Sequence, residues 1–169
     1  MKHINLKNLE PRIVVLPAIK LAAKSVTMSF SQDKTQELWK SFGPLIKSIS
    51  HKVDNDRYSV QVYPDIDFFK NFDPTRAFKK YAAIEVIEYD NLPLDLEKLI
   101  IPEGLYAIFN YIGKPSEASE TFRYILIDWL NSSKYTLSDR PHFCKMGNKY
   151  KGEQPDSEEE LMIPIILKS

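Results

Sequence analysis

The stretch from Leu99 to Leu130 reads LIIPEGLYAIFNYIGKPSEASETFRYILIDWL. Its first part, residues 99–112, is rich in β-branched and aromatic residues and has a proline near its entry, a pattern typical of a strand. After Gly113, apolar residues recur at helical spacing up to Trp129, which predicts an amphipathic helix over residues 116–131. The stretch therefore predicts a strand followed by a helix.

The first part of the chain carries a fainter copy of the same unit. The copies share a proline at the strand entry, a tryptophan in the helix and an arginine at the start of the third element. These pairs are Pro17 with Pro102, Trp39 with Trp129, and Arg57 with Arg140, which lie 85, 90 and 83 residues apart. The similar spacings predict two halves, over about residues 11–90 and 97–168, each with the order strand, helix, strand, strand.

Two such halves bury more apolar surface if their strands join into one sheet. We therefore predict an α+β fold with one antiparallel sheet, two helices on one face and a central ligand groove on the other. Residues 1–169 would form a single domain with a flexible N-terminus at residues 1–10. The alternative is that two strand–helix units of an α+β domain resemble one another by chance.

Composition excludes some partners. Lys and Arg together number 23, as do Asp and Glu, so the net charge is zero and nothing steers the chain toward nucleic acid or an anionic membrane. No apolar run approaches about 18 residues, and the first residues are too polar for a secretory signal, so a cytoplasmic location is expected. Cys144 is the only cysteine, and no further ligands lie close to it and His142 in the sequence. We predict no metal site and no cofactor.

Several motifs of the chain resemble one known family. They comprise Gly104, Tyr106-Ala107-Ile108-Phe109, Trp129-Leu130, Ser133-Lys134-Tyr135-Thr136-Leu137 and Glu160-Leu161-Met162-Ile163-Pro164-Ile165. In this order they are similar to the gyrase-inhibitor-like small-molecule-binding domain, which also forms the effector-binding half of some bacterial transcription regulators. The chain departs from the family by an inserted Lys114 before Pro115. The stretch ahead of Pro11 is too short for a DNA-binding domain, so we expect a stand-alone protein.

Strand alternation sorts the candidate site residues. If Ala82 and Ile84 face the helices, Tyr81 and Glu85 face the groove, and Glu160 and Met162 do so on the last strand. Val60 and Val62 are assigned to the helix side, which sends Gln61 and Tyr63 to the groove, and Met146 is assigned to the groove with His142 and Cys144. The predicted ligand-binding residues are Glu85, Glu160, Tyr63, Tyr81, Met146 and Met162.

Aromatic and methionine side chains around a partly desolvated carboxylate suit a flat cationic molecule. The resemblance implies the same, because drug-sensing members of the family use an acidic residue in an aromatic pocket. We predict a stand-alone protein that senses or sequesters cationic aromatic or amphipathic small molecules. The alternative for Glu85 and Glu160 is a solvated position on an open sheet face.

Two other functions stay open. One is hydrolysis of strained cyclopropane-type compounds with a groove glutamate as base. The other is a protein-interaction role such as inhibition of DNA gyrase. The sequence has no Ser-His-Asp or Cys-His arrangement, so a non-enzymatic role is favoured and no catalytic residue is assigned. A small-molecule ligand is the expected partner, no direct nucleic-acid or membrane binding is expected, and a protein partner or a homodimer stays open.

Overall fold

The computed structural model describes residues 9–169. The flexible N-terminus predicted for residues 1–10 therefore lies outside the described residues, apart from Leu9 and Glu10. Within the described range, every helix falls short of the length and apolar character that a membrane crossing requires.

Most of the chain is β-strand. The strands are β1 (Arg12–Leu16), β2 (Ile19–Met28), β3 (Lys52–Val62), β4 (Phe78–Val86), β5 (Glu97–Ile101), β6 (Gly104–Ile112), β7 (Tyr135–Leu137), β8 (His142–Met146) and β9 (Glu158–Leu167). The helices are α1 (Thr35–Phe42), α2 (Ser119–Arg123) and α3 (Leu130–Ser132). A 3₁₀ segment, Gly43–Ser48, continues α1, and a π-helical segment, Tyr124–Trp129, joins α2 to α3.

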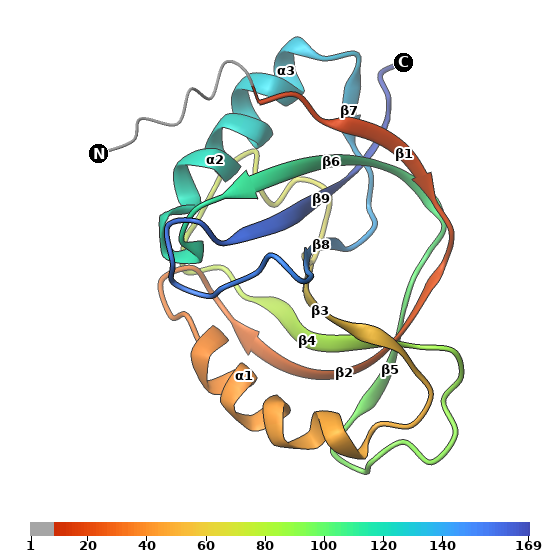
Figure 1. Cartoon of the computed structure of the whole chain (residues 1–169). Helices are drawn as coiled ribbons and strands as arrows, with labels where there is room; N and C mark the ends of the chain where they lie inside the picture. The colour runs from red at the N-terminus through yellow and green to blue at the C-terminus, as the bar shows by residue number, and fades with distance from the viewer. Residues whose placement is uncertain (1–8) are drawn as a thin grey trace.

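The strands form one antiparallel, strongly curled sheet in the order β1-β6-β9-β8-β3-β4-β2-β5, and β7 pairs with β9 (Figure 1). The order is symmetric about the junction of β8 and β3, where the two halves meet. The chain bends at Pro17-Ala18 between β1 and β2, and at Pro102-Glu103 between β5 and β6. Proline is suited to such bends because it has no N–H to donate to a ladder.

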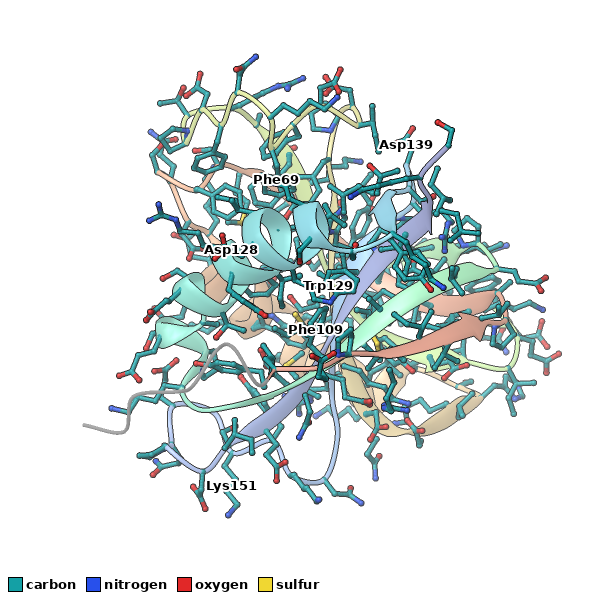
Figure 2. All side chains as sticks on the ribbon, turned by 90° about the horizontal axis from the view of Figure 1, so that it is seen from above. Phe69, Phe109, Asp128, Trp129, Asp139 and Lys151 are labelled. Carbon is teal, nitrogen blue, oxygen red and sulfur yellow. The ribbon has the colours of Figure 1, made fainter. Side chains whose placement is uncertain are left out.

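The helices lie on the outer face of the curl (Figure 1). Beneath α1, the side chains of β2 and β4 form an apolar cluster with Leu38 and Phe42. Beneath α2 and α3, those of β6 and β9 do the same, and Trp129 packs edge-on against Phe109 with ring centroids 5.1 Å apart (Figure 2). The predicted α+β fold, with one antiparallel sheet, two helical segments on one face and a groove on the other, is confirmed.

The polar composition of residues 51–57 predicts a connection between elements, but the structure has a strand here, because β3 begins at Lys52. Its first residues pair with β4 across a register shift between Lys52 and Arg57. Asp54 is exposed at the end of the sheet, and such a polar residue makes this part of the strand look like a loop in the sequence.

Candidate ligand-binding site

The concave face of the sheet carries a cluster of apolar and aromatic side chains drawn from both halves. We call it the concave cluster; it comprises Ile19, Leu21, Ala23, Tyr58, Val60, Tyr81, Ala83, Ile101, Tyr106, Ile108, Phe143 and Met162. The Phe143 ring lies 5.9 Å from that of Tyr58 and 5.3 Å from that of Tyr106, centroid to centroid. Aromatic rings at these separations attract one another, so the cluster is held together by contacts between its own rings.

A carboxylate lies at the edge of this cluster. Glu85, half-buried on β4, accepts a hydrogen bond of 3.1 Å from the Tyr58 hydroxyl. Burial, and then the negative charge of Glu85, raise the pKa of Tyr58, so the phenol keeps its proton and remains a donor. No cationic side chain within residues 9–169 forms an ion pair with Glu85. Glu85 is therefore a partly desolvated carboxylate without a paired counter-charge.

The second predicted carboxylate has a partner. Glu160, on β9, forms an ion pair with Arg12 of β1, and the Arg12 side chain is 66% exposed. Between Glu160 and Glu85, Lys145 Nζ lies 3.6 Å from Asp56 Oδ2 and 5.9 Å from the centroid of the Tyr58 ring. The two glutamates thus lie on strands separated by β8 and β3, with a polar row between them.

A cavity of about 340 Å³ opens at this end of the sheet. Its lining includes four carboxylates and two lysines: Asp56, Glu158, Glu159, Glu160, Lys145 and Lys149. The volume is within the range of small-molecule sites. The excess of carboxylates makes the cavity better suited to a cation than to an anion.

The structure brings together four of the six predicted site residues. Tyr81 and Met162 belong to the concave cluster, and Glu85 and Glu160 lie at its end. The face predicted for Tyr63 is wrong, because its ring packs against Phe68, 4.7 Å away between centroids, in a separate outer cluster.

Met146 is also on the other face. On β8, Phe143 belongs to the concave cluster and Cys144 to the cluster beneath α2 and α3, so alternation places Met146 on the outer side. His142 and Cys144 share that side. Met146 is therefore corrected to an outer-face residue.

The error has a physical cause. Val60 and Val62 were assigned to the helix side because they are apolar, but both faces of this sheet are packed, so hydrophobicity does not reveal which face a strand residue occupies. For the same reason, Tyr58 and Phe143 are missing from the predicted site residues, although both belong to the concave cluster. The sequence does offer one signal for the outer face of β3, namely the polar residues Ser59 and Gln61. They lie on that face at the centre of the sheet, whereas α1 packs on β2 and β4.

Several titratable side chains are buried on that outer face, among them His142 and Glu159. Burial lowers the pKa of His142 to about 3, so its imidazole is neutral. Burial also raises the pKa of Glu159 to about 7; the charge of Lys80 partly opposes this, and that of Glu153 adds to it. Both groups bear on stability and lie outside the concave cluster, and Glu159 also lines the cavity of about 340 Å³.

Comparison with known proteins agrees with this architecture. The transcriptional regulator BrlR of Pseudomonas aeruginosa is 25% identical over 167 residues, which are 98% of this chain and 58% of BrlR, so the chain spans little more than half of that relative. The structure of SAV2435 bound to tetraphenylphosphonium has a TM-score of 0.71 at 12% identity, with 94% of each chain covered. The EcmrR C-terminal domain has a TM-score of 0.70 at 14% identity, covering 95% of this chain and 99% of that one.

These structural likenesses concern the fold. The family assignment comes from the model of the GyrI-like small molecule binding domain, which matches residues 9–166. That range includes β1 to β8, both helical segments and all of β9 except Leu167. The chain belongs to the GyrI-like small-molecule-binding domain family.

Proposed function

We propose that the protein binds cationic aromatic small molecules on the concave face of its sheet, with Glu85 as the counter-charge. The observation that carries this proposal is the Glu85–Tyr58 pair: a half-buried carboxylate without an ion-pair partner, at the edge of a cluster of aromatic rings. A ligand cation there would meet both a negative charge and ring faces.

The concave cluster also dictates how a ligand enters. Tyr58 and Phe143 are each 2% exposed and Tyr106 is fully buried, so the rings fill the concave side in this structure. A ligand of several rings must displace some of them, whereas the cavity of about 340 Å³, whose lining residue Lys145 lies against the Tyr58 ring, is already open. We expect the ligand to enter from the cavity. Its contacts with the rings should then replace some of the contacts that the rings of the concave cluster make with one another.

The carboxylate next to the rings favours a cation over a neutral molecule. Two opposite unit charges 4 Å apart attract by about 4 kcal/mol at the effective dielectric of a protein surface. Glu160 supplies less, since a ligand would have to displace Arg12 from it. We therefore assign the main counter-charge to Glu85.

The test is calorimetric titration of the protein with tetraphenylphosphonium, the ligand bound to SAV2435. Triphenylphosphine oxide serves as a neutral aromatic comparison. Glu85→Gln keeps the shape and removes the charge, and we expect it to weaken binding of the cation at least tenfold, or about 1.4 kcal/mol. The matched control is Glu103→Gln, which removes an exposed carboxylate in the bend between β5 and β6.

Tyr63→Phe and Met146→Leu, on the outer face, should leave the affinity unchanged. Equal affinity of wild type and Glu85→Gln for the cation would overturn the assignment of Glu85. Equal binding of the neutral compound would overturn the preference for cations, and failure of both compounds to bind would overturn the proposed ligand class.

A further inference from the structure

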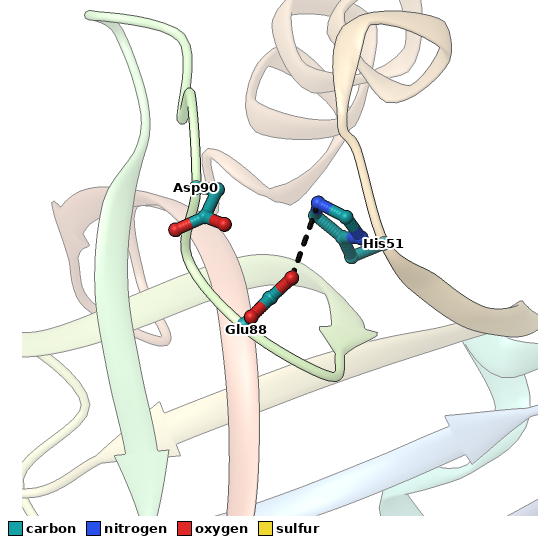
Figure 3. A group of neighbouring side chains, drawn as sticks. All are labelled: His51, Glu88 and Asp90. Atoms are coloured by element: carbon teal, nitrogen blue, oxygen red, sulfur yellow. Dashed lines mark ion pairs between the residues drawn. The ribbon is translucent and has the colours of Figure 1, made fainter.

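Three potential metal ligands meet on the surface at the end of the β3–β4 ladder. His51 immediately precedes β3, and Glu88 and Asp90 follow β4 (Figure 3). Lys52 is paired with Val86, and the Ile87 N–H donates a 2.9 Å hydrogen bond to the His51 carbonyl. The backbone therefore holds His51 opposite the segment that carries the two carboxylates.

The donor atoms are close enough to share one ion. His51 Nε2 lies 3.3 Å from Glu88 Oε1, and one ligand atom from each of the three residues lies within 4.8 Å of the others. Around an ion with bonds of about 2.1 Å, neighbouring donors are roughly 3.0 to 3.4 Å apart. Small side-chain rotations of the exposed Asp90 would complete that geometry.

From this juxtaposition we infer that His51, Glu88 and Asp90 form a binding site for a divalent first-row transition metal. An imidazole nitrogen with two carboxylate oxygens suits Zn²⁺, Ni²⁺, Co²⁺ or Cu²⁺, whereas Mg²⁺ and Ca²⁺ take oxygen ligands. Three protein donors leave the remaining coordination positions to water, so the site is of the open kind. The three residues are exposed, so an ion reaches them directly from solvent.

The site is separate from the proposed ligand-binding site. Its residues lie outside the concave cluster and do not line the cavity of about 340 Å³. A bound ion would tie the start of β3 to the connection between β4 and β5. Because the ion binds the folded arrangement, it should raise the melting temperature of the protein.

The experiment is titration of the tag-free, metal-stripped full chain with Ni²⁺ and with Zn²⁺ by calorimetry, and with Co²⁺ by visible absorption. We expect one equivalent to bind, with d–d bands in the Co²⁺ spectrum. His51→Ala, Glu88→Gln and Asp90→Asn should each weaken binding at least tenfold, and Glu103→Gln should not change it. Circular dichroism of each metal-free variant reports whether the fold is kept.

Two results would overturn the inference. One is the absence of binding by wild type up to about 1 mM of each metal. The other is binding that is unchanged in folded His51→Ala, which would place the ion at another histidine. Three substitutions of exposed residues allow the test to proceed even if one of the variants does not fold. Loss of metal binding with retained binding of tetraphenylphosphonium would leave the proposed function unaffected.

Discussion

Replacing Glu159 by glutamine should stabilise the protein above pH 7 and leave it almost unchanged at pH 4. Glu159 is 9% exposed, on the outer face of β9. Burial is the main cause that raises its pKa from 4.5 to about 7, while Lys80 opposes the effect and Glu153 adds to it. The folded protein therefore holds a proton here that the unfolded chain releases at lower pH.

The sign follows from proton linkage. Between pH 4.5 and about 7 the folded state binds more protons than the unfolded state, so the free energy of unfolding falls as the pH rises. The stability due to protonated Glu159 is complete below pH 4.5 and is lost as the pH passes about 7. At about 1.4 kcal/mol per pH unit, the difference amounts to about 3 kcal/mol.

The assay is urea unfolding followed by tryptophan fluorescence at pH values from 4 to 8. Glu159→Gln should exceed wild type by about 3 kcal/mol at pH 8, equivalent to roughly 6 to 12 °C in melting temperature. Glu103→Gln, which removes an exposed carboxylate, is the control and should follow wild type. Parallel stability profiles for wild type and Glu159→Gln would refute the reasoning, since they would show that Glu159 ionises as readily in the folded protein as in the unfolded chain.

Two further predictions concern the fold. Burial lowers the pKa of His142 to about 3, so the stability contributed by its neutral form is complete above pH 6.5 and is lost toward pH 3. Between pH 6.5 and 4, the free energy of unfolding of His142→Gln, measured in urea, should therefore fall by about 3 kcal/mol less than that of wild type. An equal fall in both proteins would contradict this prediction. A Cβ at Gly104 would collide with the Arg140 guanidinium, and Arg140 Nη2 donates to the carbonyls of Leu105 (2.7 Å) and Ile165 (3.1 Å). Gly104→Ala should thus cost about 2 kcal/mol in thermal unfolding, and an unchanged melting temperature would show that Arg140 moves away freely.

Local sequence features predicted much of the architecture. The apolar run near the end of the chain predicts a strand over residues 158–167, which is β9, and the prolines at 17 and 102 mark the two bends. The α-helix ends at Phe42 before Gly43-Pro44, where the sequence predicts an irregularity. These features depend on short-range patterns, namely apolar alternation and the missing N–H of proline.

The candidate site was less predictable, because it depends on contacts between distant segments. The two residues of the Arg12–Glu160 pair are 148 positions apart, and they meet only because β1 and β9 both neighbour β6. The faces of Tyr63 and Met146 were wrong because both sides of the sheet are packed. The proximity of His51 and Glu88 could likewise not be predicted from the sequence, because it follows from the pairing of β3 with β4.

The central claim is that ligands bind on the concave face beside Glu85. A crystal structure of the protein with tetraphenylphosphonium tests it most directly. We expect the phosphonium against Glu85 and the rings of Tyr58 and Phe143, with some of those rings rotated from the positions that they occupy in the concave cluster. A phosphonium bound on the outer face, between the helical segments and away from Glu85, would contradict the claim.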